Sequence, residues 1–273
     1  MTRLPYPQVF HNWTSQNVIN FIEAGGNVNY EGMGLRTPLI FACEKEDREL
    51  VSFLLARGAN PDSELPALIF STEKTFDLLI EHGANIHQSR TGDNKSLIYY
   101  TCAYVTKAMI DMGVNVNHES NGANILFHYS KPYMSEEKLK ILFDSGINID
   151  IVFEECNPLE YAIYNGHPEY VDLLLKYGLT ADRKNMIDNF MDINDTNTMN
   201  IVLEKIIFKT LDRESLQIIE QLIEKYPTDY NHRKLDILEE WKNIITNFHE
   251  KYLLHEEFDA KPVIYTNMNI KRI

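Results

Sequence analysis

Residues 37–62 read TPLIFACEKEDRELVSFLLARGANPD, and this stretch predicts two short helices followed by a turn. Thr37 is a suitable N-cap for a first helix that begins at Pro38, because the amide that proline lacks would have no partner in the first turn. The second helix carries apolar pairs one turn apart and ends after Leu55. Gly58 then suits the left-handed conformation that terminates helices.

The same pattern recurs along the chain. Apolar residues stand four and three positions before each of six glycines, and in five cases also seven positions before, which is the spacing of one helical face. These glycines are Gly25, Gly58, Gly83, Gly113, Gly146 and Gly178. Because one such unit cannot bury its own apolar face, the units are expected to stack on one another.

With these motifs the sequence resembles the ankyrin repeat family, whose units read Thr-Pro-Leu-His-x-Ala-Ala and then Leu-Leu-x-x-Gly-Ala-Asp/Asn. The resemblance covers residues 14–178 well and 200–230 poorly. It implies an all-α ankyrin-repeat solenoid of about seven helix-turn-helix units, the last one degenerate, closed by a C-terminal helix from about 232 to 257. The expected divisions are an N-terminal cap plus five repeats over 1–181, a degenerate repeat and helical cap over 182–257, and a tail over 258–273.

The glycine spacing predicts that two units are shortened. Successive glycines lie 33, 25, 30, 33 and 32 residues apart, whereas an ankyrin repeat takes about 33. The third and fourth units have therefore lost about one helical turn each, which should leave a notch in the stack. At the ends, we expect an opening helix around 8–13, a helix capped by Ser15, and a loop over the polar run 188–200.

Composition narrows the function classes. Lys and Arg number 26 against 40 Asp and Glu, so the formal charge of -14 argues against nucleic acid and favours a partner with a basic protein surface. Cys43, Cys102 and Cys156 show no metal-ligand spacing and suit a reducing compartment. No secretory or membrane-spanning pattern is present, so we expect a cytoplasmic, soluble protein that does not bind membranes and is monomeric apart from its partner.

Ring side chains recur two residues after the leucine of each first helix. The resemblance places this position on the concave face, where adjacent first helices touch. The rings could serve only to pack one repeat on the next, or they could also form a binding floor, since aromatic residues are enriched at interface hot spots. The candidate protein-binding residues at this position are Phe41, Phe70, Tyr99, His128 and Tyr161, and Tyr164 is a further candidate.

The turns between units, here called fingers, supply the other candidates. Met33, Arg36, Arg90, His118 and Phe153 lie on finger tips, where burial is difficult. Residues 151–153 are three consecutive apolar residues, which form either a longer buried hairpin or an exposed anchor for a partner.

Catalytic signatures are missing from the sequence. His249 and His255 are six residues apart on a predicted helix, too far around it to share a metal ion. The glycines end helices instead of opening them, so no phosphate loop is predicted. We therefore expect no enzyme activity, no metal and no cofactor. Asn29 and Asn117 occupy the turn position at which the family is hydroxylated in some members, although turn capping accounts for them equally well.

These observations predict a non-catalytic protein-binding module that acts through its concave face and finger tips. One version is an inhibitor or immunity-type protein that occludes a toxin-like target. The alternative is an adaptor or effector in which residues 182–273 carry a separate activity.

Overall fold

The computed structural model describes residues 13–90, 92, 94–128, 134–193, 195–208, 210–211, 214–225, 232–248, 250 and 263–264. The chain divides into two compact units, Met1–Asn148 and Ile149–Ile273, which are treated separately below.

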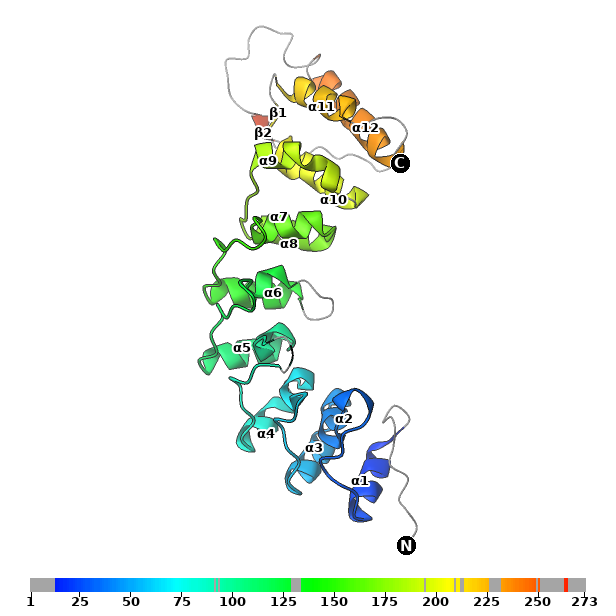
Figure 1. Cartoon of the computed structure of the whole chain (residues 1–273), viewed down its shortest axis with the longest axis vertical. Helices are drawn as coiled ribbons and strands as arrows, with labels where there is room; N and C mark the ends of the chain where they lie inside the picture. Colours follow the sequence, from blue (N-terminus) through cyan, green and yellow to red (C-terminus); the bar gives the residue numbers. More distant parts are fainter. Residues whose placement is uncertain are drawn as a thin grey trace. The chain divides into compact units, whose positions relative to one another are not determined.

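The first unit is a series of short helices joined by turns (Figure 1). Its elements are α1 (Ser15–Glu23), η2 (Met33–Leu35), α2 (Pro38–Glu44), α3 (Arg48–Leu55), η3 (Ala67–Phe70), α4 (Phe76–Glu81), η4 (Leu97–Tyr99), α5 (Ala103–Asp111), η5 (Ile125–Phe127) and α6 (Glu136–Asp144). The helix pairs predicted from residues 37–62 are α2 and α3, which pack against each other. Thr37 caps α2, as expected, by accepting a hydrogen bond from the amide of Ile40.

Shortening of the repeats falls mainly on the first helix of each pair. α2 has seven residues, whereas η3 has four and η4 has three, and both are 3-10 turns. η5 is also a three-residue 3-10 turn, although its repeat has the full glycine spacing. A 3-10 turn rises more steeply per residue than an α-helix, so it spans the same gap with fewer residues.

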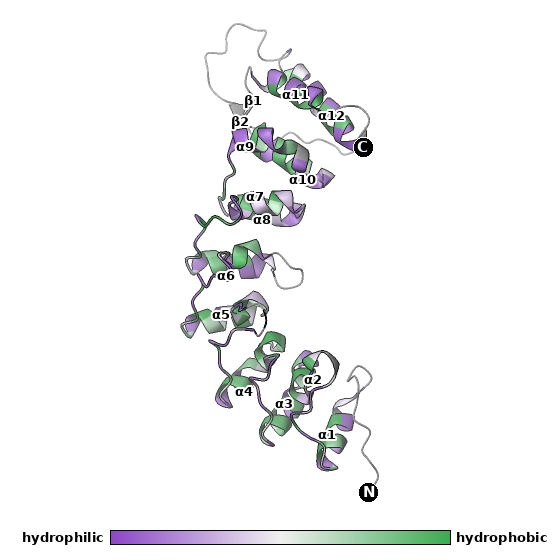
Figure 2. Cartoon of the chain, in the orientation of Figure 1, coloured by the Kyte–Doolittle hydropathy of each residue, from purple (hydrophilic) through white to green (hydrophobic). Residues whose placement is uncertain are grey.

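The positions counted back from each of the six glycines, here called the glycine register, identify the core of the helical pairs. Residues seven before each glycine are at most 3% exposed: Val18, Val51, Phe76, Thr106, Leu139 and Val171. Residues four before are at most 6% exposed: Phe21, Leu54, Leu79, Met109, Leu142 and Leu174. The residues three before are only half-buried in four units: Ile80, Ile110, Phe143 and Leu175. The buried face is therefore narrower than the sequence pattern predicts, and Figure 2 shows hydrophobic and hydrophilic residues on every helix of the stack.

Each of the six glycines ends its helix in the left-handed region, with φ between 77° and 96°. A side chain at these positions would strain the backbone, which explains why glycine recurs there.

The second unit continues the helical pairs. Its elements are α7 (Pro158–Tyr164), α8 (Pro168–Lys176), α9 (Arg183–Asp188), η6 (Phe190–Asp192), α10 (Thr196–Val202), the π-helical η7 (Leu203–Ile207), β1 (Thr210–Leu211), α11 (Ser215–Glu224), α12 (His232–Phe248) and β2 (Val263–Ile264).

The loop predicted over residues 188–200 is wrong, because α10 begins inside it. Asp195 caps this helix by accepting a hydrogen bond from the amide of Thr198. Met199, Val202 and Leu203 are fully buried, and α10 packs against α8. Burial of this apolar face outweighs the weak helix propensity of the surrounding Thr and Asn residues. α9 with α10 and η7 thus adds a helical pair that the sequence pattern did not reveal.

The ends of the chain differ in part from expectation. The opening helix predicted around 8–13 lies almost wholly outside the described residues. α1 is capped by Thr14, one residue earlier than predicted. α12 begins at His232, as expected, and packs on α11. β2, within the predicted tail, pairs antiparallel with β1 over two residues each, a small addition to an otherwise helical fold.

Candidate functional site

Six residues of the first unit form one cluster, here called the ring-and-cation cluster: Arg90, Lys95, Tyr99, Tyr100, His118 and His128. A finger brings its two cations together, because the amide of Arg90 donates to the carbonyl of Lys95 at 2.9 Å and Ser89 bridges to Ser96. The finger thus presents Arg90 and Lys95 next to η4.

Tyr99, the last residue of η4, and Tyr100, which follows it, form the base of this cluster. Tyr99 is 2% exposed and Tyr100 is 6% exposed. The hydroxyl of Tyr99 donates to the carbonyl oxygen of His118 at 2.9 Å. The guanidinium carbon of Arg90 lies 4.9 Å from the ring centroid of Tyr100, and Nζ of Lys95 lies 5.9 Å from that of Tyr99. These distances allow cation–π attraction, which holds both cations over buried rings.

Two histidines complete the cluster. The ring of His118 meets that of Tyr99 at 86° with centroids 6.3 Å apart, and the ring of His128 lies 5.7 Å from Tyr99. Nζ of Lys95 is 3.2 Å from Nδ1 of His128, within hydrogen-bonding distance. Arginine and aromatic residues, which this cluster combines, are enriched at protein interfaces.

The other predicted residues of the first unit lie outside this cluster, and two of their rings are in contact with a cation. Arg36 lies over the ring of Phe70, with Cζ 5.1 Å from the centroid, and also forms an ion pair with Glu44. Phe41 is 4% exposed, which fits the packing interpretation of the ring positions, and Lys45 lies 5.7 Å from its centroid. Met33 lies in η2, and its side chain is outside the described part of the chain.

The predicted residues of the second unit meet at another finger. The rings of Phe153 and Tyr161 are in edge contact, with centroids 5.9 Å apart. On the same finger Ile151 is 9% exposed, whereas Val152 is 62% exposed. The apolar run is therefore buried at Ile151 and exposed at Val152. Tyr164 is half-buried on α7, and burial raises the pKa of its phenol.

The tip of this finger has an unfavourable backbone. Phe153 and Cys156 form a bridge around Glu154 and Glu155, whose φ angles are 50° and 65°. The corresponding finger of the first unit has Asn121 and Gly122 at these positions, with φ of 54° and 82°. Asn-Gly is the favoured pair for such a turn, whereas Glu in the left-handed region is strained.

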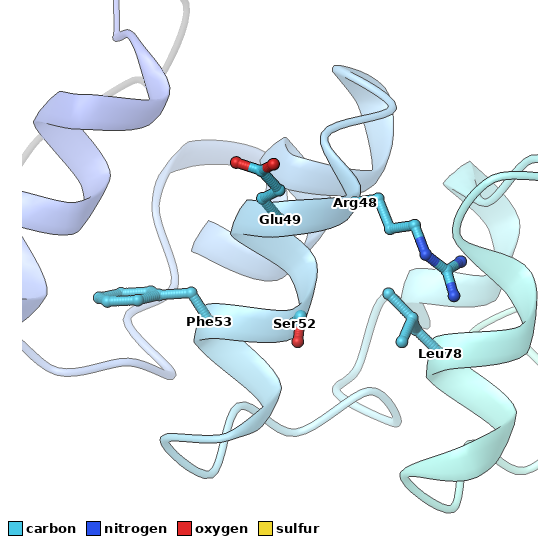
Figure 3. Close-up of a pocket in the computed structure, with 5 residues that line it drawn as sticks. All are labelled: Arg48, Glu49, Ser52, Phe53 and Leu78. Carbon is cyan, nitrogen blue, oxygen red and sulfur yellow. The ribbon is translucent and has the colours of Figure 1, made fainter.

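A groove of about 630 Å³ lies on the exposed side of α3 and is lined by Arg48, Glu49, Ser52, Phe53 and Leu78. Figure 3 shows Arg48 reaching from α3 towards α4 above Leu78, while Phe53 points to the other side of α3. A smaller hollow of about 410 Å³ is lined by residues around the start of α1 and the end of α2: Trp13, Thr14, Ser15, Phe41, Lys45 and Asp47. The lining of both grooves mixes charged and apolar side chains.

Asn29 and Asn117 have the same structural role in two places. Nδ2 of Asn29 donates to the carbonyl of Gly58 at 3.1 Å, and its Oδ1 accepts from the amide of Asn60 at 2.7 Å. Asn117 makes the equivalent bonds to Gly146 and Asn148, at 3.1 and 2.6 Å. Both side-chain amides therefore join one turn to the next.

Metal ligands and reactive thiols are the remaining chemical features to place in the described part of the chain. No group of three or more His, Cys, Asp or Glu side chains in this part of the chain could hold a metal ion. Burial raises the pKa of the Cys43 thiol to about 12, which makes it a poor nucleophile. His249 and His255 lie outside the described part. Among the described helices, none has the length and apolar character needed to cross a membrane.

Sequence reasoning missed several residues of these sites. Lys95 and Tyr100 join the ring-and-cation cluster, and only their position next to predicted residues could have indicated them. Arg48 and Phe53 line the groove on α3, outside the apolar pairs by which the sequence pattern was recognised. Lys138 is 0% exposed and lies in α6 one residue before the glycine-register position of Leu139. A lysine at such a position gives no signal of burial.

Two protein-family models match parts of this sequence. The model described as ankyrin repeats (3 copies) matches residues 98–185, and the model described as ankyrin repeat matches residues 35–64. A search of curated proteins found no match.

Solved structures include similar folds. The human ASB11 ankyrin repeat domain is 21% identical, with a TM-score of 0.48 over 61% of this chain and 81% of that chain. A chain from the complex of the Bd0816 predatory endopeptidase of Bdellovibrio bacteriovorus with immunity protein Bd3460 is 18% identical, with a TM-score of 0.45 over 58% of this chain and 89% of that one.

Proposed function

Because this chain is an ankyrin repeat protein, we propose that it is a non-catalytic module that binds another protein through its first-helix face and finger tips. The first-helix face is defined here, in the first unit, as the surface that carries α2, η3, η4 and η5, and, in the second unit, as the corresponding side of α7. The observation that carries the proposal is the ring-and-cation cluster, in which Arg90 lies over the buried ring of Tyr100 and His118 lies edge-on to that of Tyr99.

Preorganisation is the reason why such a cluster suits binding. The hydrogen bond from Tyr99 to the backbone carbonyl of His118 holds this part of the chain, and the ring contact orients the imidazole, before a partner arrives. Less conformational entropy is then lost on association than for free surface side chains. Arg36, on a finger two repeats earlier, also lies over a ring, that of Phe70.

The partner would have a basic surface. The chain carries a formal charge of -14, which accelerates the encounter with positively charged proteins. One version of this function is an inhibitor or immunity-type protein that covers the working surface of its target. In either version we place the protein in the cytoplasm, monomeric until the partner binds.

The alternative, that residues 182–273 carry a separate activity, has less support. α9 and α10 with η7 form a further helical pair, and α11 packs along α12. These described elements build more of the same stack.

The experiment is affinity capture with the full chain at low and high salt, followed by measurement of the dissociation constant of the captured partner. Arg90→Ala and His118→Ala should each weaken binding by about tenfold, since both are partly exposed in the cluster. The control is Lys107→Ala, which removes an exposed cation of α5 that pairs only with Asp111. The proposal fails if no salt-sensitive partner is captured or if all three variants bind alike.

A further inference from the structure

The finger of the second unit that spans residues 149–156, here called the acidic finger, has a defined shape. The amide of Phe153 donates to the carbonyl of Cys156 at 3.0 Å, and the amide of Cys156 donates to the carbonyl of Phe153 at the same distance. These two bonds close a tight turn that has Glu154 and Glu155 at its tip. The ring of Phe153 also contacts a tyrosine ring of α7, so the finger is attached to that helix.

Two large apolar side chains of the acidic finger are exposed. Val152, directly before the closed turn, is 62% exposed, and Ile149 is 36% exposed. A finger of the first unit is closed in the same way, by the bridge between Ser120 and Ala123, and it has Glu119 at the place of Val152. The turn itself therefore does not require an apolar residue there. Exposed apolar surface of this kind is stabilised when a partner covers it.

Negative charge in this part of the sequence has no nearby counterpart. Residues 141–175 contain no Lys or Arg and seven acidic residues: Asp144, Asp150, Glu154, Glu155, Glu160, Glu169 and Asp172. Asp172 pairs with Lys205 of η7. Glu154 and Glu155 are exposed, and neither forms an ion pair with a Lys or Arg in the described part of the chain. The two carboxylates at the tip can therefore pair with a cation from outside.

The pKa of the Cys156 thiol reflects the negative potential of the acidic finger. Burial makes the largest contribution to its raised pKa, and the carboxylates of Glu160, Glu154 and Glu155 raise it further. A nearby negative charge disfavours the thiolate, which is why these carboxylates raise the pKa. The acids of the tip and of α7 thus act on one place.

Folding does not account for the two acids at the tip. Glu154 and Glu155 have φ angles of 50° and 65°, in the left-handed region where a side chain is strained. The matching turn of the first unit has Asn121 and Gly122, the residues that this kind of turn favours. Strained residues of this kind cluster at functional sites, where a role in binding offsets their cost.

We propose that the acidic finger docks an extended segment of a partner protein in which two arginines flank an apolar residue. The guanidinium groups bind Glu154 and Glu155, and the apolar residue covers Val152. Val152 and Glu155 are three residues apart, so their backbones lie within about 11 Å, which a segment of three or four residues can span. Arginine suits this site better than lysine, because its planar fork binds a carboxylate through two hydrogen bonds.

This docking site rests on the proposed function, since it takes up the basic protein partner described there and adds one finger and the type of segment it holds. The test uses the full chain, labelled with ¹⁵N, and the synthetic peptide acetyl-Gly-Arg-Leu-Arg-Gly-amide. Backbone amide shifts should concentrate in residues 151–156 and in α7. The same peptide with citrulline in place of arginine keeps the shape without the charge, and it should bind at least fivefold more weakly.

Glu154→Asn with Glu155→Gly removes both carboxylates and relaxes the turn, so a loss of binding in this variant does not come from unfolding. It should bind the arginine peptide about fivefold more weakly, and Val152→Ser should bind it about twofold more weakly. The matched control is Glu239→Gln with Glu240→Gln, which removes another exposed pair of consecutive acids from the second unit, on α12. This control should leave peptide binding unchanged.

Three outcomes would overturn the docking site. An equal loss in the α12 control would show attraction by net charge alone. Equal binding of the citrulline peptide would exclude recognition of arginine, and unchanged binding after Glu154→Asn with Glu155→Gly would place the peptide elsewhere.

Affinity capture separates this docking site from the proposed function. A captured partner whose binding is unchanged by Glu154→Asn with Glu155→Gly would overturn the docking site and leave the proposed function intact. Peptide binding at the acidic finger without any captured partner would contradict the proposed function and leave the recognition of arginine intact.

Discussion

Nζ of Lys138 lies 2.7 Å from the backbone carbonyl oxygen of Thr101, and the lysine side chain is 0% exposed. This contact joins α6 to the segment that precedes α5. Burial lowers the pKa of the Lys138 ammonium to about 7, because the interior solvates a charge poorly.

The pH dependence of stability should therefore contain a term from Lys138. Its pKa is about 7 in the folded state against 10.5 as the ordinary value, so the unfolded chain binds more protons between these two pH values. The free energy of unfolding should then rise with pH across this range, by up to about 1.4 kcal/mol per pH unit from this group.

Urea denaturation of the wild type and of Lys138→Met at a series of pH values measures this term. The difference in free energy of unfolding, wild type minus variant, should increase from pH 7 towards pH 10. A difference that stays constant with pH would mean that Lys138 keeps its ordinary pKa in the folded protein.

The finger tip at Glu154 and Glu155 should be a site where stability can be gained. Both residues have positive φ, and each left-handed residue other than glycine costs about 1 kcal/mol or more. The double change Glu154→Asn with Glu155→Gly should raise the free energy of unfolding by about 1–2 kcal/mol.

The matched control is the reverse exchange in the first unit, Asn121→Glu with Gly122→Glu, which should destabilise its finger by a similar amount. Thermal denaturation followed by circular dichroism compares the two pairs. Equal melting temperatures for all three proteins would contradict the strain.

Asn117 should contribute to stability through both ends of its amide. Asn117→Ala removes its bonds to Gly146 and Asn148, and should lower the free energy of unfolding by about 1–3 kcal/mol. Asn29→Ala should act alike, since its bonds are equivalent. Asn20→Ala on the exposed side of α1 serves as a control with only a local contact to Gln16. Losses no larger than that of the control would argue against a role in joining turns.

The order in which the three cysteine thiols react with a labelling reagent should follow their exposure. Cys102 is exposed, Cys156 is half-buried, and Cys43 is 0% exposed with its pKa raised to about 12. Because the thiolate is the reactive form, Cys102 should react first and Cys43 only on unfolding. Iodoacetamide labelling with peptide mass spectrometry measures the order, and single Cys→Ser variants assign it. Early labelling of Cys43 in the native protein would contradict its burial.

The sequence could predict the parts of the fold that depend on local pattern. Gly58 and its five counterparts mark helix ends because left-handed backbone favours one residue type, and the residues four and seven positions before them are buried. α10 escaped prediction because Thr196 and Asn197 suggest a turn, whereas burial of Met199 and Val202 decides the structure.

The candidate site was less predictable from the sequence. Arg36, Arg90 and the ring positions were found from repeat spacing, but the pairing of Arg90 with Tyr100 depends on how a finger folds back. Tyr99 was a candidate for contact and is nearly fully buried, because its hydroxyl reaches the carbonyl of His118. The groove on α3 is lined by residues of α3 and α4 that share no sequence motif.

The bonds of Asn29 reach only as far as the next turn, to Gly58 and Asn60, and those of Asn117 reach only to Gly146 and Asn148. Within the first unit, tension applied at one end would accordingly be borne by one junction at a time. Such a chain would unfold in small successive steps under force, and it would refold in the same order when the force is removed.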